Sequence, residues 1–83
     1  MAILSCMERQ LLERLNVEAN VTFAFRKSDF SRRVAHGTRN LRYVPAHQWP
    51  KQKEAPSDSV ITYYDLDKNE WRSFRIGSLL EIR

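Results

Sequence analysis

The sequence predicts a small, mainly β protein that forms a single domain, residues 1–83, in which short strands make a barrel capped by an N-terminal helix. The chain has 83 residues, which is enough for one small core. Apolar residues recur about every four residues before position 17, as in a helix, and every two residues after position 20, as in a strand. With 42% hydrophobic and 29% charged residues, the composition is that of a folded chain and not of a disordered one.

Three classes of protein are disfavoured at once. No apolar run reaches the ~18 residues that a membrane helix needs. Charged residues interrupt the first fifteen positions, which is untypical of a signal peptide. Cys6 is the only cysteine and cannot form an internal disulfide. We therefore expect a cytoplasmic protein without a membrane partner.

Residues 5–16 are predicted to form the helix. Ser5 and Glu8 have the spacing of a capping box, in which each side chain binds the backbone N–H of the other residue. The apolar stripe of this helix consists of Met7, Leu11, Leu12 and Leu15. Because so short a helix is unstable alone, we expect it to close one end of the barrel or to pair with another chain.

Two strands are predicted next, over residues 21–26 and 32–38, with turn-forming residues at 27–30. The apolar face of the first strand is formed by Val21, Phe23 and Phe25. In the second strand we expect Val34 to point into the core and Gly37 to be free to adopt a positive φ. The following segment contains Pro45, Pro50 and Pro56, so we expect a long loop over residues 45–59 that is either functional or mobile.

The C-terminal part is predicted to be a β-hairpin of residues 60–66 and 71–76. A turn at Lys68 and Asn69 would place Asp65 opposite Arg72 and Tyr63 opposite Phe74. One face is then apolar and belongs to the core: Ile61, Tyr63, Phe74 and Ile76. The other face is aromatic and basic, and we expect it to be incompletely buried: Thr62, Tyr64, Leu66, Trp71, Ser73 and Arg75.

Gly77 is expected to end the hairpin, and a short final strand follows with Leu79, Leu80 and Ile82. A helix followed by four to five short, strongly bent strands favours a small SH3-like or Sm-like barrel, because closure removes exposed strand edges. An open four-stranded α+β sandwich is the alternative.

The hairpin also carries a resemblance to a known family. The run Tyr63-Tyr64-Asp65-Leu66 and the run Trp71-Arg72-Ser73-Phe74-Arg75-Ile76, together with Phe23-Ala24-Phe25-Arg26-Lys27 and His36-Gly37-Thr38, resemble the small stand-alone WYL-like, Sm-like SH3 β-barrels of bacteria and bacteriophages. The resemblance spans about residues 20–83. It implies the barrel fold, a tendency to bind nucleic acid or protein, and a location in a bacterial cell or a phage-infected host.

Catalytic and metal-binding patterns are missing from the sequence. Cys6, His36 and His47 do not have the spacing of a zinc site. The acids around the hairpin turn, Asp65, Asp67 and Glu70, are typical of turn chemistry. No nucleophile has a base placed beside it in the sequence. We expect no enzyme, no cofactor and no metal.

Binding of RNA or DNA is the favoured function. The chain carries a formal net charge of +4, and its positive charge is concentrated between positions 26 and 53. Cations attract the phosphate backbone, and aromatic rings stack on unpaired bases. The predicted nucleic-acid-binding residues are Arg26, Lys27, Arg32, Arg33, Arg39, Arg42, Tyr43, Trp71 and Arg75.

The alternative is a protein-binding regulator or inhibitor, encoded by a phage and acting on a host or defence protein. Trp49, Trp71, Tyr43 and Arg42 are residue types that dominate protein interfaces. Unpaired terminal strands would also allow a homo-oligomer.

Overall fold

The structure is mainly β, as predicted. It is a computed structural model that describes residues 4–50 and 60–83. Within these residues the elements are α1 (Cys6–Val17), β1 (Val21–Arg26), β2 (Arg32–Thr38), the 3₁₀ turns η1 (Leu41–Tyr43) and η2 (Ala46–Gln48), β3 (Val60–Asp65), β4 (Glu70–Arg75) and β5 (Leu79–Ile82).

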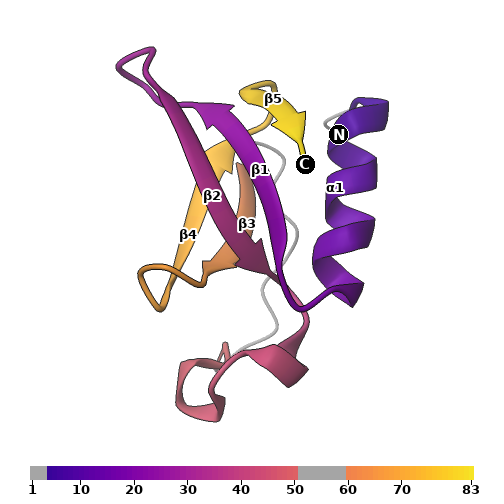
Figure 1. Ribbon diagram of the computed structural model, residues 1–83, viewed down its shortest axis with the longest axis vertical. Helices are drawn as coiled ribbons and strands as arrows, with labels where there is room; N and C mark the ends of the chain where they lie inside the picture. Colours follow the sequence, from indigo (N-terminus) through magenta and orange to yellow (C-terminus); the bar gives the residue numbers. More distant parts are fainter. Residues whose placement is uncertain (1–3, 51–59) are drawn as a thin grey trace.

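The five strands form one antiparallel sheet in the order β4-β3-β2-β1-β5. The two outer strands, β4 and β5, are joined only by residues 76–78. In a flat sheet they would lie about four strand spacings, or roughly 19 Å, apart. A link this short spans about 14 Å at most. The sheet must therefore curl until its two edges approach each other, which is the barrel-like shape seen in Figure 1.

The predicted helix is confirmed. Ser5 and Glu8 form the expected capping box, and the helix runs one residue beyond the predicted end, to Val17. Its apolar stripe contacts the sheet: Leu11 and Leu15 are fully buried in the core, and α1 lies along the side of the sheet formed by β1 and β5 (Figure 1). Of the two expectations for this helix, covering its own barrel or pairing with another chain, the structure shows the first: the helix covers the core of its own chain.

Glu8 also joins α1 to the sheet. One oxygen of its carboxylate accepts a hydrogen bond from the Ser5 N–H (3.0 Å), and the other accepts one from the Gly77 N–H (2.6 Å). Burial raises the pKa of Glu8, but these two backbone hydrogen bonds and the hydrogen bond with the Ser5 side chain together outweigh burial and hold the pKa below its ordinary value of 4.5. The cap thus ties the start of the helix to the β4–β5 turn.

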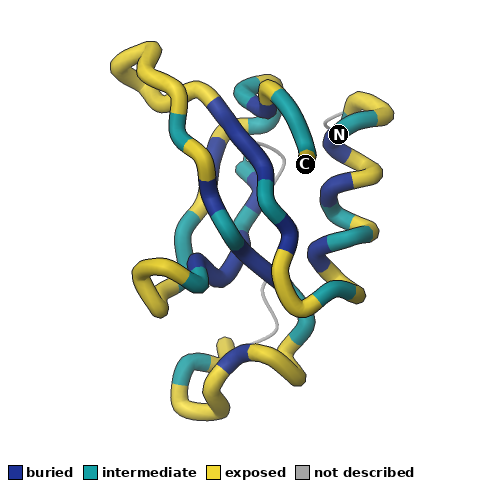
Figure 2. Tube along the Cα trace, viewed as in Figure 1, coloured by how far each residue is buried: buried dark blue, intermediate teal, exposed yellow. Residues whose placement is uncertain are grey.

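The first two strands contribute the centre of the core, which Figure 2 shows as a buried band between an exposed hairpin tip and exposed loops. Val21, Phe23 and Phe25 are buried as predicted. Val34, however, is 39% exposed, so the prediction that it points inward is wrong. Its partner across the sheet is Ala24, whereas Phe23 pairs with Ala35, and strand alternation puts only one of these two pairs in the core.

Gly37 has a different role from the one predicted. Its φ is not positive, a feature that Gly77 shows instead, with φ 95°. A Cβ added at Gly37 would lie 2.6 Å from Cδ2 of Tyr63 and 3.1 Å from the Tyr64 carbonyl oxygen. Glycine is required here because the Tyr63 ring lies directly against the backbone of β2.

The β3–β4 hairpin has a register two residues away from the predicted one. Ile61 pairs with Phe74 and Tyr63 with Arg72. The turn has four residues, Leu66 to Asn69, and Asn69 adopts φ 56° while its N–H binds the Asp65 carbonyl (2.8 Å). A shift of two residues leaves each side chain on its predicted face. Ile61, Tyr63 and Phe74 are in the core, and Ile76 packs partly buried against it.

The outer face of this hairpin is incompletely buried, as predicted: Ser73 and Arg75 are exposed, and Tyr64 is its buried residue. Tyr64 is only 1% exposed, because Trp71 packs edge-on against its ring at 5.5 Å and the Trp71 indole N–H donates to the Gln48 carbonyl of η2. The predicted loop 45–59 thus begins with an ordered turn, and its residues 51–59 lie outside the described residues. The predicted final strand is confirmed as β5.

Candidate functional site

A cationic cleft of about 600 Å³ lies between the β1–β2 hairpin and β4. Its floor is apolar and consists of Phe25, Tyr63 and Phe74, which belong to the core. Five cationic side chains line it: Arg26, Lys27, Arg33, Arg72 and Arg75. None of its lining residues is an Asp or Glu. We refer to this site as the cationic cleft.

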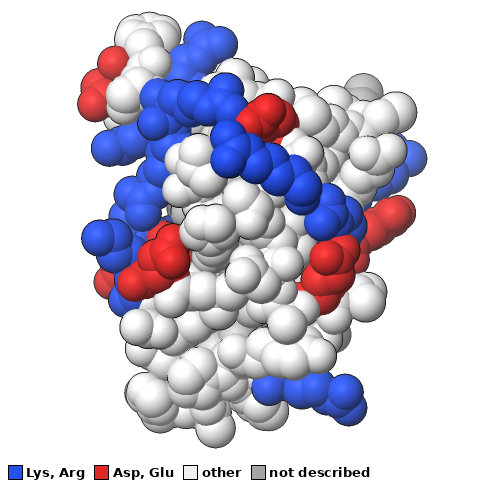
Figure 3. Space-filling view, viewed as in Figure 1, with Lys and Arg blue, Asp and Glu red and all other residues white. Residues whose placement is uncertain are grey.

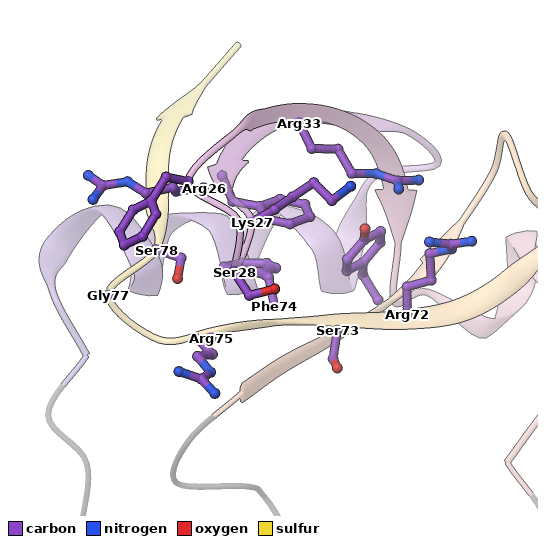
Figure 4. Close-up of a pocket in the computed structure, with 13 residues that line it drawn as sticks. Arg26, Lys27, Ser28, Arg33, Arg72, Ser73, Phe74, Arg75, Gly77 and Ser78 are labelled. Atoms are coloured by element: carbon purple, nitrogen blue, oxygen red, sulfur yellow. The ribbon is translucent and has the colours of Figure 1, made fainter.

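The fold brings these cations together from separate places in the sequence. Arg26 ends β1, Lys27 begins the turn and Arg33 lies on β2. Figure 4 shows that the side chains of Lys27 and Arg33 extend toward the end of the cleft where Arg72 of β4 lies, whereas Arg26 lies at the other end. Arg75 projects from the opposite side of β4, as strand alternation requires for a neighbour of Phe74.

Asp65 lies beneath one end of the cleft and contacts two of its arginines. It is 1% exposed, and its Oδ2 lies 3.2 Å from Arg33 Nη2 and 3.7 Å from Arg72 Nε. Its Oδ1 accepts hydrogen bonds from the backbone N–H groups of Asp67 (2.9 Å) and Lys68 (3.1 Å). The ion pair expected between Asp65 and Arg72 therefore exists, and Arg33 shares the same carboxylate. Arg72 also pairs with Glu70, whose Oε1 lies 2.6 Å from Arg72 Nη2. At this end of the cleft, two carboxylates therefore balance the charge of the two guanidinium groups and hold them in place.

The other cleft cations are available to a ligand. Arg26, Lys27 and Arg75 are exposed. Within the described part of the chain, their side chains make no hydrogen bond or ion pair. Lys27 lies close enough to Asp29 to lower the pKa of that carboxyl group. Three exposed cations outnumber this one carboxylate, so the mouth of the cleft carries a net positive charge.

Other predicted binding residues have internal partners. Arg32 forms an ion pair with Glu81 of β5. The Arg39 guanidinium donates to the Thr62 carbonyl, so it links the segment after β2 to β3. Trp71 is half-buried against Tyr64 and hydrogen-bonded to Gln48, as described above. These side chains support the fold.

Arg42 and Tyr43 lie on η1, at the end of the molecule opposite the β1–β2 hairpin (Figure 1). Both residues are exposed, and the exposed fraction of Tyr43 is 44%. In Figure 3, most Lys and Arg side chains of the visible face lie in its upper half, over the hairpin, and few lie near η1. The nine predicted residues are thus divided between the cleft, the structural contacts and the η1 end.

Among the lining residues absent from the predicted set, Arg72 and Phe30 matter most for binding. The sequence predicts only an ion pair for Arg72. Because Arg72 lies two residues from Phe74, both side chains are on the same face of the strand, which indicates a position of Arg72 at the rim of the core. Phe30 was treated as part of a turn. It lines the cleft, and a large apolar side chain within a run of polar turn residues was the available signal.

The remaining polar groups of the site are structural. Tyr63 is fully buried, and burial, with a smaller effect of the Asp65 charge, raises its pKa to about 12. The phenol therefore stays protonated at neutral pH. Outside the cleft, His36 Nδ1 shares a hydrogen bond with Thr22 Oγ1 at 2.9 Å.

Residues 4–50 and 60–83 contain no group of three His, Cys, Asp or Glu side chains placed to hold a metal ion. In that same part of the chain, no helix has the length and apolarity needed to cross a membrane.

Comparisons with known proteins agree with this architecture. The chain is 33% identical over 61 residues to an uncharacterized 11.5 kDa protein in the Gp31-cd intergenic region of Enterobacteria phage T4; the aligned part is 70% of this chain and 60% of that protein. No solved structure matches the chain. The model of the WYL_2 family, described as an Sm-like SH3 beta-barrel fold, matches residues 9–80. This match extends the predicted resemblance into the helix, and the chain therefore belongs to the WYL_2 family of Sm-like SH3 β-barrels.

Proposed function

We propose that this protein is a non-enzymatic binding module that engages nucleic acid through the cationic cleft. The observation that supports the proposal is the lining of the cleft, which includes five cations and no Asp or Glu. Asp65 and Glu70 pair with two of these cations, Arg33 and Arg72, and the other three lie outside these ion pairs. A phosphate chain offers one negative charge per nucleotide, and its binding releases condensed counterions. The cleft supplies the matching row of positive charge.

The two ends of the cleft suit different parts of such a ligand. Arg33 and Arg72 are held by Asp65, so little conformational freedom is lost when they contact a phosphate. Arg26 and Lys27 are exposed and unpaired, so they can follow the backbone as it leaves the cleft. Phe25 and Phe74 form an apolar floor beneath both groups.

The proposal is tested by fluorescence anisotropy with labelled single-stranded and double-stranded oligonucleotides at several salt concentrations. If the protein neutralises roughly four phosphates, the log–log slope of affinity against salt should lie between about −3 and −4. The double variant Arg26→Glu/Lys27→Glu should abolish binding with little change in Tm, because both side chains are exposed.

The matched control is a charge reversal elsewhere on the surface. Arg9→Glu/Arg42→Glu changes the net charge equally, at exposed positions on α1 and η1, and should reduce affinity far less. Equal losses in the two double variants would contradict a localised site. Absence of binding to every oligonucleotide at low salt would remove the proposal.

A second candidate function is protein binding, as a phage-encoded regulator or inhibitor of a host or defence protein. It is favoured by the apolar surface near η1 and η2, where Leu41, Tyr43 and Trp49 are 37%, 44% and 46% exposed. Tyr43→Ser should then abolish copurification of one protein at a fixed ratio after nuclease treatment, while Lys27→Glu should not. An empty purification would count against this candidate.

A further inference from the structure

The tip of the β1–β2 hairpin carries the most exposed large hydrophobic side chain of the described residues. Phe30 is 79% exposed and has φ 69°. A bulky residue with positive φ is uncommon, because its Cβ crowds the following carbonyl oxygen. Phe30 therefore has an unfavourable backbone conformation and buries almost none of its ring.

The turn holds Phe30 in this conformation. The Lys27 N–H donates to the Ser31 carbonyl (2.8 Å), and the Phe30 N–H donates to the Lys27 carbonyl (2.9 Å). Asp29 Oδ1 accepts from both the N–H (3.0 Å) and the hydroxyl of Ser31 (2.5 Å). Glycine or asparagine would occupy position 30 at lower cost, so the folded state offers no reason for a phenyl ring there.

The surroundings of the ring supply a reason. Phe30 lines the cationic cleft together with Lys27 and Arg33. An exposed aromatic ring beside a track of cations is the arrangement on which unpaired bases stack while their phosphates are neutralised. In a duplex, the bases already stack on one another and their faces are not available.

We infer that Phe30 is a base-stacking residue and that the ligand of the cleft is single-stranded nucleic acid. This inference rests on the proposed function and adds to it the strandedness of the ligand and the residue that selects it. The strain at position 30 is retained because it presents the ring at the mouth of the cleft.

The test compares ligands of equal charge. Anisotropy is measured with a labelled single-stranded oligothymidylate of roughly 12 nucleotides, an abasic chain of the same length, and a hairpin duplex. The wild-type protein should bind the oligothymidylate roughly tenfold more tightly than the abasic chain, because only the former provides rings to stack. Equal affinities for these two chains would overturn the inference.

Variants at position 30 assign the effect to the ring. Phe30→Asn should lower oligothymidylate affinity roughly tenfold, leave abasic-chain affinity unchanged, and keep or raise Tm, because asparagine tolerates positive φ. Phe30→Trp should restore the affinity. Val17→Asn, at another exposed apolar position with 71% exposure, is the control and should change nothing.

The outcomes separate this inference from the proposed function. If Arg26→Glu/Lys27→Glu abolishes binding but Phe30→Asn leaves it intact, the cleft binds nucleic acid and Phe30 is not a stacking residue. A lower Tm for Phe30→Asn would show that the ring supports the fold and would also overturn the inference. If no oligonucleotide binds and Phe30→Asn instead abolishes copurification of a protein, both proposals fail.

Discussion

The two ends of this barrel use their cations in different ways. At the cationic cleft, Arg26, Lys27 and Arg75 are exposed and, within the described residues, unpaired. Toward the α1 and η1 end, Arg39 hydrogen-bonds a strand carbonyl and Arg14 forms an ion pair with Glu18 at 2.8 Å. These three cations of the cleft thus lie outside ion pairs, whereas Arg39 and Arg14 make structural contacts elsewhere. The number of cations in a segment does not indicate which of them are available to a partner.

The same contrast holds for the groups beneath each end. Under the cleft, the buried Asp65 holds two arginines and the β3–β4 turn. Near the helix, the buried Glu8 holds the N-terminal cap and the β4–β5 turn through backbone N–H groups. Asp65 therefore fixes the positions of cationic side chains in addition to a turn, whereas Glu8 connects only backbone segments. Four substitutions test this comparison.

The largest effect is expected at the floor of the cleft. Phe74 stacks on Phe25, with ring centroids 5.0 Å apart, and is 4% exposed. Phe74→Ala should lower the free energy of unfolding by about 3–5 kcal/mol, measured by urea denaturation. Ser73→Ala, on the opposite face of the same strand, should be nearly neutral. Similar losses for both variants would contradict the assignment of the core face.

Asp65→Ala should have the next largest effect, about 3 kcal/mol, because it leaves Arg33 without its carboxylate partner and the turn N–H groups unsatisfied. Arg72 keeps its ion pair with Glu70. Denaturation at high and low salt measures the loss. Glu81→Ala is the control, since its pair with Arg32 is exposed on both sides and should contribute under about 1 kcal/mol. A neutral Asp65→Ala would show that the cleft does not depend on this charge.

Gly37→Ala should cost about 2 kcal/mol, because the new methyl group overlaps the Tyr63 ring. Gly77→Ala tests a different mechanism, since open space surrounds that position and only φ 95° opposes a side chain, at about 1 kcal/mol. In a double-mutant cycle, Tyr63→Leu should relieve the Gly37→Ala penalty and leave the Gly77→Ala penalty unchanged. An unrelieved penalty would place the strain elsewhere.

A modest effect, about 1–2 kcal/mol at neutral pH, is expected for Glu8→Gln. Because folding lowers the pKa of Glu8 from 4.5, its charge stabilises the protein fully above that pH, and this contribution is lost as pH falls through the lower folded pKa. The difference in unfolding free energy between wild type and variant should shrink from pH 6 to pH 3. Glu13→Gln, an exposed position on the same helix, should show no such change.

Local patterns in the sequence were sufficient for most of the elements. The Ser5–Glu8 cap, the period of two in β1 and the alternation in β3 and β4 each depend on neighbouring residues, so helix, strands and core faces could be predicted directly. The inward placement of Val34 was wrong because the face of β2 depends on its register with β1. The hairpin register was two residues off because a four-residue turn replaced the assumed two-residue turn.

The sequence by itself determined the mainly β fold, the capped helix and the excess of positive charge, because these depend on composition and on short-range periodicity. Only the tertiary structure decided which cations share a surface. Arg72 joins Arg33 through a buried carboxylate, while Arg32, the neighbour of Arg33 in the chain, pairs with Glu81 instead. Adjacent residues of a strand point to opposite faces, so Arg32 and Arg33 are separated although they are neighbours in the chain. Arg33 and Arg72 are far apart in the chain, and the curled sheet brings them together.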